Sequence, residues 1–211
     1  MKDFAGNLYH YCEELYNVNK KIIELVALDA RSNHQQIESN FLFISCGLMR
    51  LIPCRRKNDK LYLMFTDGIL SFKEELSFLE HDYNQLFADH HDLLKSIKDI
   101  RNKTEHCPHK LNLYSILNDP IKSPTICFNL HDQDLTEEYR LDLREIVLLI
   151  KGLNKVFDKI LEEFRIDISK NHSEKLTSPY CKKITGLEYE KFNRILESAL
   201  LYDISNLMQN F

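Results

Sequence analysis

Glycine is scarce in this chain of 211 residues, and the glycines that are present stand apart from one another. There are five, and they are Gly6, Gly47, Gly68, Gly152 and Gly186. A loop that cradles a phosphate needs clustered glycines, because backbone N–H groups must approach the anion closely. Neither common glycine-rich nucleotide motif occurs, and the GxSxG motif of serine hydrolases is absent too. These absences argue against most nucleotide-cofactor enzymes and serine hydrolases.

Long apolar runs and paired cysteines are also missing. The longest aliphatic run covers residues 146–150, far fewer than the about 20 apolar residues that a membrane span needs. Residues 1–4 lack the apolar core of a secretory signal, so we expect a cytoplasmic protein with no membrane partner. The six cysteines have no CxxC spacing, and HExxH is absent. We therefore expect reduced thiols, no metal site and no other cofactor.

The charge balance is slightly acidic, with 28 Lys and Arg against 32 Asp and Glu, which gives a net charge of −4. Proteins that coat duplex nucleic acid are usually basic overall, so any nucleic-acid contact here must be local. Hydrophobic residues make up 44% and charged residues 28% of the chain. That composition is typical of a folded globular protein and not of a disordered one.

Apolar residues recur every three or four positions through most of the chain, which predicts amphipathic helices. The stripes cover residues 8–26, 37–51, 143–164 and 192–211. Pro53 ends the second of these helices, since its ring is incompatible with a helix interior.

The helix over residues 143–164 has Thr136 as its expected N-cap. Between residues 72 and 106 the apolar phase continues without glycine or proline. One very long helix and two helices that separate near Asp89 both fit this pattern.

Two stretches are less regular. Residues 61–72, with Asp67 and Gly68 at the centre, fit either a small β-hairpin or a loop that leads into the next helix. Residues 107–134 contain three prolines and predict a long insertion with room for one or two short strands. The sequence thus predicts a mainly α fold, an antiparallel bundle of about four to six helices in a single domain over residues 1–211.

Residues 99–108 carry the most distinctive chemistry. An apolar helical face runs into this segment, and Pro108 disfavours helical geometry at the residue before it. We expect the helix to end near His106, where the carbonyl end of the helix dipole favours the imidazolium form. Arg101 lies five residues earlier, so the two side chains point about 140° apart around the helix axis.

This pair of residue types suits cleavage of a phosphodiester. Histidine titrates near neutral pH and can take or give a proton during turnover. Arginine is permanently charged and grips phosphate oxygens with its planar fork. Attack by an internal 2′-hydroxyl needs one proton shuttle and one cation, and it needs no metal.

The segment from Ile100 to His106 reads Ile-Arg-Asn-Lys-Thr-Glu-His, an R-x4-H motif with a polar residue directly after the arginine. In this form it resembles the HEPN superfamily (higher eukaryotes and prokaryotes nucleotide-binding domain). Members are small helical bundles that usually dimerise. Many are metal-independent endoribonucleases of toxin–antitoxin, abortive-infection and CRISPR-associated systems. The sharp part of the resemblance is confined to this motif and its helix.

The resemblance implies that Arg101 and His106 form a catalytic pair and that Asn102 helps to orient them. Lys103 is expected to orient the site or contact the RNA backbone. The family places the motif at a homodimer interface, so the facing wall of each cleft would come from the partner chain. The resemblance also implies that RNA is the substrate and that the protein acts as a toxin or antiphage protein. It further implies an antitoxin protein as a partner. One subgroup is adenylylated on a tyrosine two residues after the histidine, but Pro108 stands here, so we do not extend that mechanism to this chain.

Two other functions fit the sequence. The first is a non-catalytic interaction module of the same fold, which binds a partner protein or a nucleotide and uses Arg101 and His106 for structure. The second is a metal-dependent helical hydrolase, which suffers from the lack of paired ligands at helical spacing. The basic run from Arg50 to Lys60 fits either a solvated loop after Pro53 or a guide for RNA.

Overall fold

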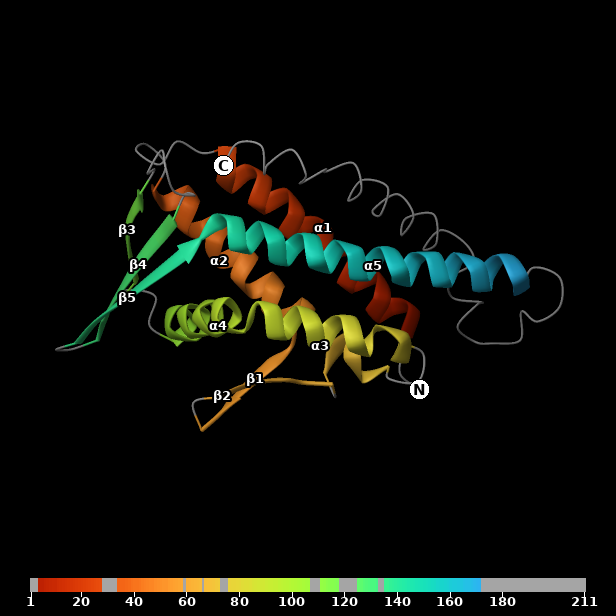
Figure 1. The fold of residues 1–211 in the computed structure, drawn as a ribbon. Helices are drawn as coiled ribbons and strands as arrows, with labels where there is room; N and C mark the ends of the chain where they lie inside the picture. The colour runs from red at the N-terminus through yellow and green to blue at the C-terminus, as the bar shows by residue number, and fades with distance from the viewer. Residues whose placement is uncertain are drawn as a thin grey trace.

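The computed structural model describes residues 4–27, 34–58, 60–65, 67–72, 76–106, 111–117, 125–132 and 135–171. Its helices are α1 (Phe4–Ala27), α2 (His34–Leu51), α3 (Glu80–Asp89), α4 (His91–His106) and α5 (Leu143–Asn171). Two short 3-10 helices, η1 (Gly68–Ser71) and η2 (Ser77–Leu79), precede α3. The predicted mainly helical fold is confirmed at this level (Figure 1). The stripe over residues 192–211 lies outside the described residues.

The helices bury their apolar stripes against one another. Helix α5 packs against α1 and α3, while α2 packs against α1 and α4. The largest fully buried side chains include Tyr83, Phe41, Phe157, Ile22, Leu25 and Ile37. At Gly152 of α5 a Cβ atom would clash with Leu86 of α3, so glycine permits the close approach of these two helices.

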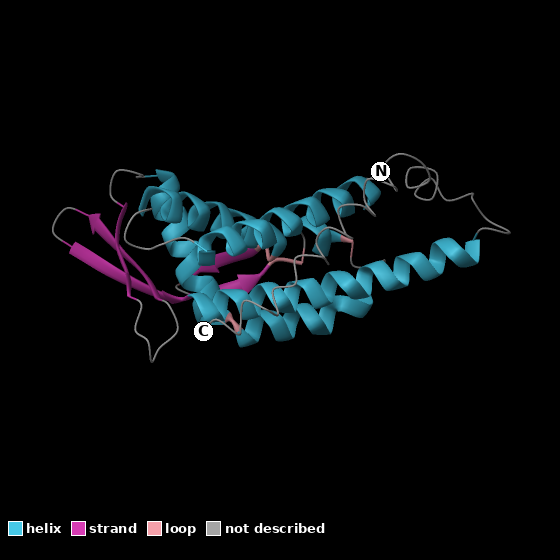
Figure 2. Cartoon of the chain, turned by 90° about the horizontal axis from the view of Figure 1, so that it is seen from above, coloured by secondary structure: helices cyan, strands magenta, loops and turns pink. Residues whose placement is uncertain are grey.

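The strands form two separate antiparallel sheets. Strands β1 (Cys54–Lys57) and β2 (Lys60–Leu63) make a hairpin, and Asn58 in its turn has a φ of 50°. Strands β3 (Leu111–Leu117), β4 (Thr125–Asp132) and β5 (Leu135–Asp142) make a sheet with β4 in the centre. This sheet lies at one end of the helices, and β5 leads directly into α5 (Figures 1 and 2).

Of the two alternatives for residues 61–72, the β-hairpin centred on Asp67 and Gly68 does not form in the described residues. The strand-forming segment near Leu61 does form β2, but it pairs with Cys54–Lys57, which precedes it. Residues Gly68–Ser71 form η1, so the alternative of a segment leading toward the next helix is nearer to the structure. The basic residues after Pro53, for which a solvated loop was one alternative, lie on β1 and β2 instead.

The insertion is more regular and longer than expected. It carries three strands and extends to Asp142, whereas one or two strands ending by residue 134 were predicted. Thr136 is therefore a residue of β5 and not the N-cap of α5. Asp142 has that role, because its Oδ1 accepts a hydrogen bond of 2.8 Å from the backbone N–H of Arg144.

The long apolar stretch between residues 72 and 106 is divided. Helix α3 ends at Asp89 and α4 begins at His91, so the alternative of two helices with a break near Asp89 is confirmed. Helix α4 then ends at His106, as expected from Pro108. Among the described residues, no helix is both long enough and apolar enough to cross a membrane.

Candidate functional site

Helix α4 holds the R-x4-H motif in its last turns. Leu94, Ile97 and Ile100 recur at helical spacing and are fully buried, so they anchor this helix in the core. Arg101 follows the last of these anchors directly, and His106 is the last residue of α4. The backbone thus places both predicted catalytic residues at the C-terminal end of one well-packed helix.

Arg101 and its neighbour Asn102 are in contact. The guanidinium Nη1 of Arg101 donates to Oδ1 of Asn102 at 3.4 Å, and both side chains are half-buried. An amide oxygen this close restrains the guanidinium fork, because arginine has only donors to offer. Asn102 therefore touches the residue that it was predicted to orient.

Lys103 is turned toward the three-stranded sheet. Its Nζ donates to the hydroxyl of Tyr139 on β5 at 3.1 Å and lies 5.4 Å from the centre of the ring. A hydrogen bond and a cation–π contact to the same side chain fix the ammonium group beside β5. No pattern in the sequence indicates this contact, since Tyr139 is 36 residues away along the chain.

The same stretch of α4 is tied to the β1–β2 hairpin. Arg56 Nη1 lies 2.6 Å from Asp99 Oδ1, and Lys98 Nζ donates to the backbone oxygen of Cys54 at 2.6 Å. Cys54 is buried, and burial raises the pKa of its thiol to about 12, against an opposing effect of Lys98. The hairpin is thus held against α4 two to three residues before Arg101.

The structure therefore brings together Arg101, Asn102 and Lys103 on α4, although Lys103 engages β5. The side chain of His106 lies outside the described residues, so only its place on the helix is established. Within the described part of the chain, no group of three or more His, Cys, Asp or Glu side chains is placed to hold a metal ion.

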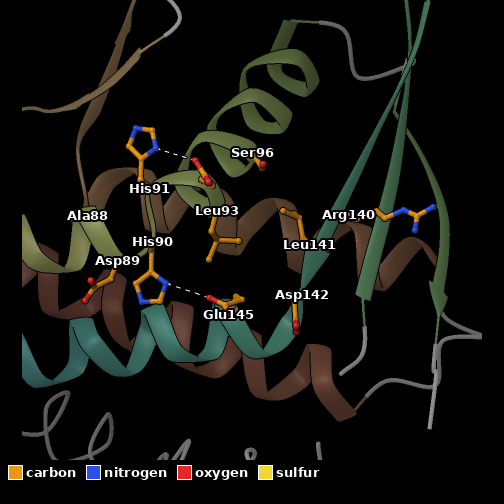
Figure 3. A pocket seen from close by; sticks show the side chains of 11 residues that line it. Ala88, Asp89, His90, His91, Leu93, Ser96, Arg140, Leu141, Asp142 and Glu145 are labelled. Carbon is orange, nitrogen blue, oxygen red and sulfur yellow. Dashed lines mark hydrogen bonds and ion pairs between the residues drawn. The ribbon is translucent and has the colours of Figure 1, made fainter. Parts of the chain in front are cut away.

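A pocket of about 390 Å³ lies at the other end of α4. It is formed where the α3–α4 junction meets the junction of β5 with α5 (Figure 3). His90, His91, Arg140, Asp142 and Glu145 contribute to its lining. With Asp89 and Asp92 it contains four carboxylates and one guanidinium, so its charge disfavours a phosphate chain.

The pocket lies along the N-terminal part of α4, whereas the motif occupies the C-terminal end of this helix. Its lining on α4 runs from His91 to Ser96, and Ser96 is five positions before Arg101, which corresponds to about 7.5 Å along the axis. His81 is exposed on α3, whereas His90 occupies the turn between α3 and α4. No pattern in the sequence indicated that α5 would come to lie beside it.

His90 is the titratable group most affected by this pocket. Its side chain is 12% exposed, and its Nδ1 lies 3.7 Å from Oε2 of Glu145 (Figure 3). Burial lowers the pKa of His90, and the charges of Glu145 and Asp89 oppose that effect only in part. The folded protein therefore keeps this imidazole neutral at pH values where an unfolded chain would protonate it.

We expect His90 to make folding stability pH-dependent. As the pH falls below the ordinary value of 6.5, the unfolded chain takes up a proton before the folded protein does, so the free energy of unfolding decreases until the lowered pKa is reached. His90→Gln should flatten this decline in urea titrations between pH 7 and pH 5. His81→Gln, at an exposed position on α3, is the matched control. An unchanged pH profile in His90→Gln would contradict the assignment.

Comparisons with protein-family models, with curated proteins and with solved structures found no match to this chain.

Proposed function

We propose that this protein is a metal-independent endoribonuclease of the HEPN type. It cleaves RNA by attack of a 2′-hydroxyl on the adjacent phosphate and leaves a 2′,3′-cyclic phosphate and a 5′-hydroxyl. A cytoplasmic toxin or antiphage role, with an antitoxin protein as a further partner, follows from the resemblance of the motif to that family.

One observation carries the proposal. The R-x4-H motif occupies the C-terminal turns of α4, and the helix that presents it is fixed in the core by Ile97 and Ile100. Catalytic groups must be held in place before the reaction, and a packed helix does this better than a loop. The helix C-terminus also favours a protonated histidine, which a leaving 5′-oxygen requires.

The two residues have complementary roles in this mechanism. His106 removes the proton of the 2′-hydroxyl and returns a proton to the departing 5′-oxygen, from one protomer or from both. Arg101 neutralises the charge that develops on the pentacoordinate phosphorus. A homodimer that brings two such helix ends together would supply the facing wall of the cleft, since the two side chains of one helix diverge by about 140°.

A second function is favoured by the environment of Arg101. This side chain is half-buried and contacts Asn102 of its own chain, as expected for a residue that stabilises a helix end. A non-catalytic interaction module, which binds a partner protein or a nucleotide, would use it in that way. The two functions differ in what purified protein does to RNA.

The test is cleavage of total RNA by purified protein in excess EDTA, with end-group analysis of the products. Wild-type protein should yield cyclic-phosphate and 5′-hydroxyl ends at the same rate with EDTA or with Mg²⁺. His106→Ala, purified in parallel, should yield none, which also excludes a contaminating nuclease. Strict dependence on a divalent metal would overturn the mechanism, and inactivity of the wild type would favour the interaction module.

A further inference from the structure

The β1–β2 hairpin has two faces of different character. In an antiparallel pair, residues directly opposite each other share a face. Arg55 is opposite Tyr62 and Lys57 is opposite Lys60, so these four side chains lie on one face, and all four are exposed. The other face points to the protein, where Cys54 and Leu61 are buried and Arg56 pairs with Asp99.

Among the described residues, no carboxylate pairs with the cations Arg55, Lys57 and Lys60 of the exposed face. Lys57 and Lys60 are direct cross-strand partners, and like charges in that position destabilise a sheet. The hairpin keeps its positive charge even when Asp59 of the turn is counted. A cluster of this kind in an acidic chain is suited to an anionic ligand.

Tyr62 narrows the class of ligand. Its side chain is 49% exposed and stands beside Arg55 in the hairpin register. Exposed aromatic rings next to arginine and lysine are the usual platform for unpaired bases, which stack on the ring while the cations hold the phosphates. Paired bases in a duplex do not offer their faces for stacking, and an acidic peptide has no base to stack. The combination therefore favours single-stranded RNA.

The position of the hairpin connects this face with α4. The contacts of Arg56 with Asp99, and of Lys98 with the Cys54 carbonyl, hold β1 beside the helix just before Arg101. Figure 1 shows β1 and β2 alongside this part of the helical layer. Each strand has four residues and spans about 13 Å. That length suits a short stretch of RNA that continues toward the end of α4.

We propose that the exposed face of the β1–β2 hairpin, formed by Arg55, Lys57, Lys60 and Tyr62, binds single-stranded RNA and leads it to the R-x4-H segment. This role as a substrate guide rests on the proposed ribonuclease function. The binding itself does not depend on catalysis.

The test measures binding of a fluorescein-labelled, fully 2′-O-methylated RNA oligonucleotide by fluorescence anisotropy, because this RNA lacks the attacking hydroxyl and stays intact. Lys57→Gln/Lys60→Gln should raise the Kd about tenfold at low salt and reduce its salt dependence. Tyr62→Ser should raise the Kd about fivefold or more, whereas Tyr62→Phe keeps the ring and should bind like the wild type. A duplex of the same length should bind more weakly than the single strand.

The matched control is Lys20→Gln/Lys155→Gln, which removes the same charge from exposed positions on α1 and α5. Equal weakening by this control, or unchanged binding in the hairpin variants, would overturn the proposal. The proposal would also be overturned if poly-glutamate bound as tightly as RNA and if Tyr62→Ser did not weaken that binding. If the wild type cleaves RNA and the hairpin variants bind and cleave RNA as well as the wild type, the role of the hairpin as a guide is refuted and the ribonuclease function is retained. Hairpin-dependent binding without any cleavage would refute the ribonuclease and retain the binding face.

Discussion

Arg101→Lys is expected to slow RNA cleavage by about 10²–10³-fold, the loss found when a group that stabilises developing charge is removed. Lysine retains the charge and most of the aliphatic stem, so the fold should be kept. It cannot present the planar, two-pronged donor set that matches two phosphate oxygens. The loss should appear in single-turnover cleavage rates at saturating protein, because a transition-state contact affects the chemical step more than binding.

The matched control for this variant is Arg144→Lys, at an exposed position on α5. It should cleave like the wild type and melt at the same temperature. Arg101 is half-buried, so thermal unfolding of both variants must be measured beside the rates. If Arg101→Lys retained full activity with an unchanged melting temperature, Arg101 would have no catalytic role, and the cleavage mechanism would have to do without it.

The second large effect concerns stability, and it arises from a pair of amides, Asn19 on α1 and Asn154 on α5, of which Asn19 is fully buried. Asn19 is fully buried, and its Nδ2 donates to the Leu15 carbonyl at 2.8 Å and to Oδ1 of Asn154 at 2.9 Å. Asn154 Nδ2 donates back to Asn19 Oδ1 at 2.9 Å. Asn154→Leu should lower the free energy of unfolding by about 1–3 kcal/mol, since it leaves a buried amide unsatisfied. For a chain of this length, each kcal/mol corresponds to about 2–4 °C in melting temperature.

A double-mutant cycle separates this effect from a general intolerance of the site. Asn19→Leu/Asn154→Leu removes both polar groups with side chains of similar branching, and it should be more stable than either single variant. Asn84→Leu, at an exposed position on α3, should be nearly neutral. Strictly additive single effects would show that the two amides do not depend on each other.

The helical part of the fold could be predicted because an amphipathic helix depends on the spacing of apolar residues that are close together in the sequence. The stripe that ends before Pro53, the break near Asp89 and the end of α4 at His106 all depend on residues a few positions apart. Strand pairing depends on the partner instead. Strand β1 has a single buried residue, Cys54, followed by three exposed cations, and nothing in that segment alone indicates a strand.

The end of the insertion could not be predicted for a related reason. Threonine is a good N-cap by residue type, which made Thr136 the expected cap. The deciding fact is that Thr136 pairs with His131 in the sheet, which leaves the cap to Asp142. The motif itself could be located from the sequence. Its contacts with Tyr139 and with the hairpin could not, because they join segments about 40 residues apart.

The contacts of α5 with helices that precede it far back in the chain have a consequence for folding during synthesis. Asn154 meets a partner 135 residues earlier in the chain, and Lys159 pairs with Asp82, which precedes it by 77 residues. A ribosome releases α1 first, and the apolar faces of α1 and α3 must wait until α5 has been synthesised. During that interval the nascent chain exposes apolar surface, and self-association competes with productive folding. Synthesis of α5 is therefore required before these apolar faces of α1 and α3 can be buried.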